Sequence, residues 1–135
     1  MTVDKWVAQA FLQAVGLGDV DAVEELLAPG ATWEAAAAGD HPFGGVQSRD
    51  QFMGMVRVIR GQFPEGIRYE VHRVVAEGGV VVVEATGDGP VTPDLVYRNR
   101  HVFILEVRAG KVVGGREYMD SAYLTAFMAA LPRPS

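Results

Sequence analysis

The sequence of 135 residues contains no cysteine, which excludes disulfide bonds and thiolate metal ligands. It has no run of about 18 apolar residues, so we expect no membrane-spanning helix. Lysine and arginine are outnumbered by aspartate and glutamate, 12 against 17, and the net charge of −5 disfavours nucleic acid as a partner. The first residues lack the basic segment and apolar core of a secretory signal, so we expect a cytoplasmic protein.

Hydrophobic residues are plentiful by contrast, at 49% of the chain. They suffice for a buried core, and the length is typical of one domain, so we expect residues 1–135 to form a single domain. The three histidines are scattered without the spacing of metal ligands, and no glycine-rich phosphate loop follows an expected strand. We therefore expect no metal and no cofactor.

The first half of the chain has the hydrophobic periodicity of helices. Gly18 and Asp19 mark the end of one helix and the start of the next. Ser48 and Gln51 have the spacing of a capping box for a third helix. The expected helices are residues 3–17, 20–27 and 49–61; a short strand begins at 31–34, and residues 39–45 are expected to be a loop.

The second half has the alternation of strands. We expect strands at residues 67–76 and 80–86, a loop over 87–94, and then a long hairpin that turns at 108–111. Ser121 is expected to cap a short terminal helix. Helices followed by a mostly antiparallel sheet of four to six strands indicate an α+β fold.

Glu117 lies in the second arm of this hairpin. Desolvating a carboxylate on a half-buried strand is costly unless the group has a partner or a chemical role. Simple alternation across the hairpin puts Arg98 and Arg100 on the same face as Glu117. An ion pair with either arginine is therefore the alternative to acid/base chemistry.

Several strings carry a family resemblance: Gly-Asp-Val-Asp at 18–21, Ala-Thr-Trp at 31–33, Gly-Lys-Val-Val at 110–113 and Arg-Glu-Tyr-Met-Asp at 116–120. With the element order, they make the chain resemble the nuclear-transport-factor-2-like (NTF2-like) superfamily, in its SnoaL-like polyketide-cyclase and ketosteroid-isomerase-like branch. The resemblance covers nearly the whole chain. It implies a cone-shaped, cystatin-like fold, in which a curved sheet wraps around helices and an internal apolar cavity. It also implies a homodimer formed through the exposed sheet face.

The resemblance also separates the chemistries known in this superfamily. The catalytic positions of the ketosteroid isomerases fall on residues that cannot do that chemistry: Ala35, Phe11 and Val102. Two of the three epoxide-hydrolase positions fall on Ala85 and Gly87, and the third on Glu117. Glu117 also matches the acid/base carboxylate of phenazine-pathway members and several cyclases.

Glu117 and His41 are the catalytic candidates that follow. The resemblance implies that the loop of His41 rims the cavity mouth, where the ring could shuttle protons; the alternative is a solvated histidine. The expected ligand-binding residues are Trp33, Met53, Phe63, Arg98, Arg100 and Met119. His72 and Glu84 are minor candidates, and the sequence leaves open which sheet face they occupy.

Two functions remain open at this point. The first is a cofactor-independent acid/base enzyme of cyclase, isomerase or hydrolase type, which acts on a small hydrophobic molecule in the cavity. The second is a non-catalytic small-molecule-binding or dimeric assembly module with the same fold. A fold of this kind hosts many activities, so the geometry around Glu117 has to distinguish them.

Overall fold

The computed structural model describes residues 2–35 and 44–132, which form four helices and a six-stranded sheet. The helices are α1 (Val3–Leu17), α2 (Val20–Leu26), α3 (Arg49–Gln62) and α4 (Ser121–Ala130). The strands are β1 (Leu27–Ala35), β2 (Gly45–Gln47), β3 (Arg68–Glu77), β4 (Val80–Thr92), β5 (Leu95–Arg108) and β6 (Lys111–Met119). The α+β class expected from the sequence is confirmed.

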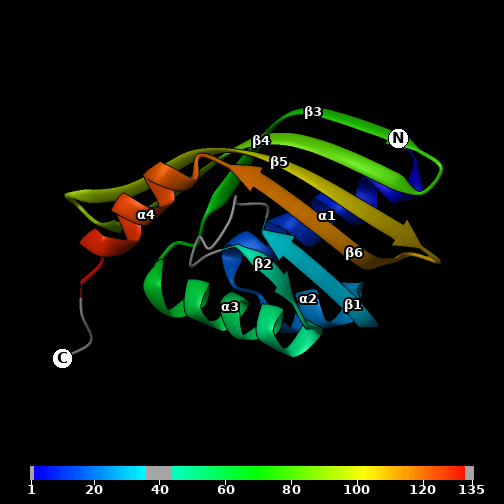
Figure 1. The fold of residues 1–135 in the computed structure, drawn as a ribbon, viewed down its shortest axis with the longest axis horizontal. Helices are drawn as coiled ribbons and strands as arrows, with labels where there is room; N and C mark the ends of the chain where they lie inside the picture. The colour runs from blue at the N-terminus through cyan, green and yellow to red at the C-terminus, as the bar shows by residue number, and fades with distance from the viewer. Residues whose placement is uncertain (1, 36–43, 133–135) are drawn as a thin grey trace.

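The sheet is mixed and mostly antiparallel, with the order β2-β1-β6-β5-β4-β3 over the described residues. Four neighbouring pairs run antiparallel, and β1 runs parallel to β6. Figure 1 shows the sheet curving over α1, with α3 below and α4 beyond the end of β6. One face of the sheet therefore wraps around helices, as the cone-shaped fold requires, and the other face is left uncovered by them.

Local signals fix the helix ends. The Ser48 hydroxyl accepts a hydrogen bond from the Gln51 amide, and the Gln51 side chain accepts one from the Ser48 amide, so the capping box is confirmed. Gly18 ends α1 with a positive φ of 66°. At α4 the cap is Asp120 rather than Ser121, because the Asp120 carboxylate accepts the amide of Tyr123 at 3.0 Å.

Three strands differ from expectation. β1 begins at Leu27, directly after α2, and not at residue 31. The short strand β2 was not predicted, and β4 continues to Thr92 through the segment expected to be a loop. Gly87 and Gly89 suggest a turn in the sequence, yet both pair with β5. Their role is close approach: a Cβ at Gly87 would lie 3.0 Å from the Tyr69 ring, and one at Gly89 would lie 3.0 Å from the Phe63 ring.

The core lies between the concave sheet face and the helices. Phe11, Leu27, Val56 and Phe103 are buried in it. The rings of Phe11, Trp33 and Phe52 pack together at its centre, with Trp33 and Phe52 centroids 4.8 Å apart. Among the described residues, no helix is both long and apolar enough to cross a bilayer.

Candidate active site

An interior cavity of about 260 Å³ lies between the concave sheet face, α1, α3 and α4. Its wall is mostly apolar, and seven aromatic side chains contribute to it: Trp33, Phe52, Phe63, Tyr69, Tyr97, Phe103 and Phe127. Two larger depressions, of about 560 and 600 Å³, are open to solvent on the described surface. We place the candidate site in the interior cavity because an enclosed apolar pocket with a few convergent polar groups is the usual form of a ligand site.

Glu117 is the acidic group of this cavity. Its Oε1 accepts a hydrogen bond from Trp33 Nε1 at 3.3 Å, and its Oε2 lies 3.3 Å from His101 Nδ1. The Glu117 side chain is 13% exposed and the His101 side chain 4%. A carboxylate and an imidazole therefore lie in contact inside an aromatic wall.

Tyr97 holds the other side of the His101 ring, with its hydroxyl oxygen 2.9 Å from Nε2. Burial raises the pKa of Tyr97 and the negative charge of Glu117 raises it further, while a hydrogen bond from Asn99 lowers it. The net direction is upward, so the phenol keeps its proton. We assign this proton to the contact with His101 Nε2, which leaves the histidine proton on Nδ1, facing Glu117.

The contact between His101 and Glu117 is close but not aligned. His101 Nδ1 is buried and has no hydrogen bond of good geometry to any described residue, although Oε2 is 3.3 Å away. A buried donor without an aligned acceptor costs about 1–3 kcal/mol. A bound molecule, or a small rotation of either side chain, would satisfy it.

Tyr69 and Phe103 fix the plane of the His101 ring. His101 stacks on Phe103 with centroids 5.3 Å apart and planes 1° apart, and Tyr69 meets both rings edge-on at 5.5 and 5.3 Å. Burial raises the pKa of Tyr69 well above its usual value, and the charge of Glu117 adds to the effect. Tyr69 therefore offers an uncharged hydroxyl to the cavity.

A register shift explains why Glu117 faces inward. β5 pairs with β6 in one register up to Glu106 and in another from Val107, and Val113 has no partner in the ladder. Beyond the shift, Glu117 pairs with Phe103 and therefore shares its face. Without the extra residue, Glu117 would lie opposite Val102 and point outward.

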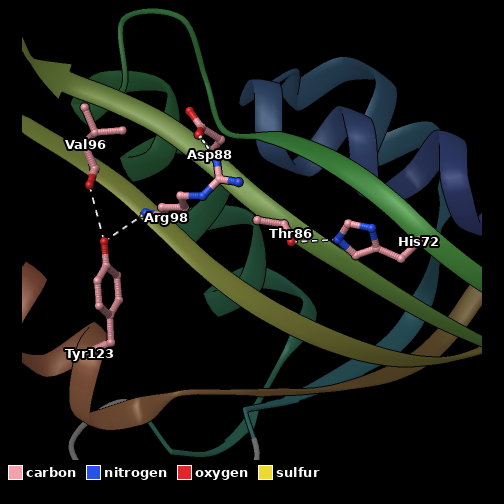
Figure 2. A network of polar contacts seen from close by, with 6 residues as sticks. All are labelled: His72, Thr86, Asp88, Val96, Arg98 and Tyr123. Atoms are coloured by element: carbon pink, nitrogen blue, oxygen red, sulfur yellow. Dashed lines mark hydrogen bonds and ion pairs between the residues drawn. The ribbon is translucent and has the colours of Figure 1, made fainter.

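The same shift makes the expectation for Arg98 and Arg100 wrong. Both lie on the outer sheet face, away from Glu117, and both are exposed. Arg98 forms an ion pair with Asp88 at 2.7 Å, as Figure 2 shows. Because the arginines are on the opposite side of the sheet, neither can pair with Glu117 or contribute to the cavity.

The minor candidates also lie outside the cavity. His72 is exposed on the outer face and its Nε2 lies 2.7 Å from the Thr86 hydroxyl (Figure 2). Glu84 is exposed on the same face. His41 falls in the segment 36–43, outside the described residues.

The expected wall is partly correct. Trp33, Phe63 and Met119 line the cavity, but Met53 is buried in the core without lining it. Successive residues of a helix are about 100° apart, so Met53 points away from the face of α3 that lines the cavity. That face is formed by Phe52, Met55, Val58, Ile59 and Gln62.

Sequence reasoning missed the partners of Glu117, namely Tyr69, Tyr97 and His101. A signal was present in β5, where Tyr97, Asn99, His101 and Phe103 occupy alternate positions, with arginines or valine between them. That alternation indicates one aromatic face and one polar face. It does not connect this aromatic face to Glu117, because simple alternation gives the wrong register for β6.

The fold and the cavity define a protein of the nuclear-transport-factor-2-like architecture. A family model described as the SnoaL-like domain matches residues 8–115, so the chain belongs to the SnoaL-like family. No curated protein matches the chain.

Solved structures show the same fold at low sequence identity. A nuclear-transport-factor-2-like protein of unknown function from Burkholderia pseudomallei is 18% identical, with a TM-score of 0.78 over 96% of this chain and 100% of that one. IdmH from Streptomyces antibioticus, provisionally described as a polyketide cyclase, is 20% identical, with a TM-score of 0.73 over 94% and 99%. An epoxide hydrolase of M. tuberculosis, described as LEH-like, is 21% identical, with a TM-score of 0.75 over 94% and 90%.

Proposed function

We propose that the chain is a cofactor-independent acid/base enzyme of cyclase, isomerase or hydrolase type that acts on a small hydrophobic molecule in the interior cavity. One observation carries this proposal: Glu117 is the sole Asp, Glu, Lys or Arg among the described lining residues, and it contacts His101 there. A carboxylate and an imidazole in a mostly apolar cavity form a pair able to accept and return a proton.

Each group has a distinct role in this proposal. Glu117 takes a proton from the bound molecule through Oε2, while Trp33 fixes the other oxygen. His101 donates a hydrogen bond from Nδ1 to the negative charge that develops on the ligand as its proton moves to Glu117. Tyr97 does not react; it is a positioning residue that keeps the His101 proton on Nδ1. Proton transfer by a positioned group contributes about 10²–10⁴-fold in rate.

Hydrogen–deuterium exchange at the carbon next to a ketone tests the proposal without knowledge of the natural substrate. The probe is 1-indanone, a small, planar and apolar ketone, followed by NMR in D₂O. We expect the protein to accelerate the exchange over buffer, and Glu117→Gln to remove about 10²-fold or more of that acceleration. The control is Glu34→Gln, since Glu34 lies in the same region of the sheet but forms an exposed pair with Arg116. An exchange rate equal to that of buffer, or unchanged in Glu117→Gln, contradicts the role of Glu117.

A non-catalytic module assembled as a homodimer is the second candidate, and the outer sheet face supports it. Val75, Val82 and Ile104 lie in one row across β3, β4 and β5, and Tyr118 is exposed on β6. A contiguous apolar row in water favours association, and a second copy would cover it. In this case the cavity would bind a ligand without turnover, so 1-indanone would bind and exchange no faster than in buffer.

A further inference from the structure

The negative charge of Glu117 has no positive side chain beside it in the cavity. No lysine or arginine is among the described lining residues, and Arg98 and Arg100 are on the opposite sheet face. A carboxylate in an apolar enclosure is costly unless a charge of opposite sign accompanies it. The described lining therefore leaves a place for a cation.

His101 does not fill that place. In the tautomer assigned above, the Tyr97 hydroxyl donates to Nε2, and the ring donates from Nδ1 alone. Trp33, the other neighbour of the carboxylate, is a neutral donor. Both groups orient Glu117, but neither balances its charge.

Aromatic rings line the same cavity as the carboxylate. Trp33 and Phe103 have centroids 6.3 Å apart, and Tyr69 meets Phe103 at 5.3 Å. The faces of such rings attract organic cations within about 6 Å of the centroid, and the attraction is stronger where water is excluded. An acidic group inside an aromatic enclosure is the combination that recognises an ammonium group.

We propose that the cavity takes a small organic cation: a protonated amine on an apolar, aromatic or alicyclic skeleton. The ammonium group pairs with Glu117, and the skeleton packs against Phe63 and Phe127, which stack on each other at 6.1 Å. The cavity volume of about 260 Å³ limits the skeleton to one or two rings, since pockets for drug-sized ligands measure about 300–1,000 Å³. This inference names the substrate class for the proposed function and rests on the same site.

A series of ligands with one skeleton and three charges tests the inference. The probes are 3-phenylpropylammonium, 3-phenylpropan-1-ol and 3-phenylpropionate. The chain has two tryptophans, and Trp6 is 60% exposed while Trp33 is 4% exposed in the cavity wall. In a Trp6→Phe background, fluorescence therefore reports binding at Trp33 alone.

We expect the ammonium to bind at least about tenfold more tightly than the alcohol, which is the contribution of one charge-assisted hydrogen bond, and the carboxylate to bind weakest. Glu117→Gln should abolish the preference of ammonium over alcohol, whereas the surface control Glu34→Gln should keep it. Binding of the alcohol to Glu117→Gln verifies that the cavity is intact. Should that variant fail to fold, Glu117→Asp, which retains the charge, is expected to keep the preference.

Equal or tighter binding of the alcohol in the Trp6→Phe protein overturns the inference. So does an ammonium preference that survives in folded Glu117→Gln. These are equilibrium measurements, independent of turnover. If the cavity prefers the ammonium but accelerates no proton exchange, the inferred ligand class stands and the proposed catalysis is contradicted. If it prefers the alcohol yet accelerates exchange, the proposed catalysis stands and the inferred ligand class is contradicted.

Discussion

The missing side chain of Gly115 sets the position of Trp33, and through it the position of the Glu117 carboxylate. A Cβ at Gly115 would lie 2.3 Å from Cζ3 and 2.7 Å from Cε3 of the Trp33 ring. Real atoms do not approach so closely, so the indole can lie flat on β6 only because this residue is glycine. The hydrogen bond from Trp33 to Glu117 depends on the same contact.

Gly115→Ala is therefore expected to displace Trp33 and to lower the free energy of unfolding by about 1–3 kcal/mol, the usual cost of overpacking a core. Gly114→Ala is the matched control, because its Cβ would meet nothing closer than 3.8 Å. Denaturant unfolding followed by tryptophan fluorescence measures both variants. Equal stability of the two would show that the Trp33 ring moves aside freely.

The buried phenols of Tyr69 and Tyr97 predict a loss of stability at alkaline pH. Their usual pKa is 10.0, and in the folded chain burial raises the pKa of both. Above pH 10 the unfolded chain loses these protons while the folded chain retains them. The free energy of unfolding then falls as pH rises, by up to about 1.4 kcal/mol per pH unit for each tyrosine.

Guanidinium unfolding at several pH values above 10 measures this slope. Tyr97→Phe should remove the contribution of one of the two tyrosines. The part of the slope of unfolding free energy against pH that comes from buried phenols should therefore fall to about half. A slope unchanged in Tyr97→Phe would mean that the phenol ionises equally in the folded and unfolded chains.

At the scale of elements, α4 is attached to β5 by the hydroxyl of Tyr123. This hydroxyl accepts the Arg98 amide at 2.9 Å and donates to the Val96 carbonyl at 3.3 Å, as Figure 2 shows. These backbone groups lie beyond the end of β6, where no described strand pairs with β5 on that side. A side chain thus replaces a missing strand, and the helix that carries it covers one end of the cavity.

Tyr123→Phe should leave two backbone groups of β5 to solvent and loosen α4. We expect faster amide exchange in α4 and at Arg98, measured by hydrogen–deuterium exchange mass spectrometry, with a loss of global stability of about 1 kcal/mol or less. Phe127 remains buried and holds the helix in place. Tyr118→Phe, which removes a hydroxyl from an exposed residue of β6, should leave the exchange of α4 unchanged.

The helices could be predicted from the sequence because their signals are local. The capping box at Ser48 and the stop at Gly18 depend only on residues within one helical turn. The course of β4 could not be predicted, because Gly87 and Gly89 leave room for the rings of Tyr69 and Phe63, which are distant in the sequence. A glycine needed for close approach and a glycine needed for a turn look the same in a sequence.

The site was predictable to the same limited degree. Its acidic group was identified, since Glu117 is a carboxylate on a half-buried strand in a string typical of the family. Its partners were not, because a single unpaired residue, Val113, reverses which face of β6 points inward. The length of the hairpin turn does not reveal an extra residue in one arm. Alternation counted from the turn therefore places Arg98 and Arg100, and not His101, on the face of Glu117.

At the scale of the whole molecule, the uncovered sheet face leads to a prediction about association. We expect a dimer in solution at micromolar concentration, and Ile104→Glu should shift it to a monomer by placing a charge in the apolar row. Val3→Glu is the control, since Val3 is equally apolar and 70% exposed but lies on α1. Analytical ultracentrifugation measures both, and a monomeric unsubstituted protein would contradict the prediction.

The parallel pairing of β1 with β6 has a consequence for how the chain folds. Trp33 and Glu117 are 84 residues apart in the sequence. We expect β1 and β6 to pair only after the antiparallel strands between them in the sequence have brought their ends together. Contacts of such long sequence separation slow the search for the native topology. We therefore expect the Glu117 carboxylate to acquire its indole partner late in that search, and the fluorescence of Trp33 would time the completion of the cavity.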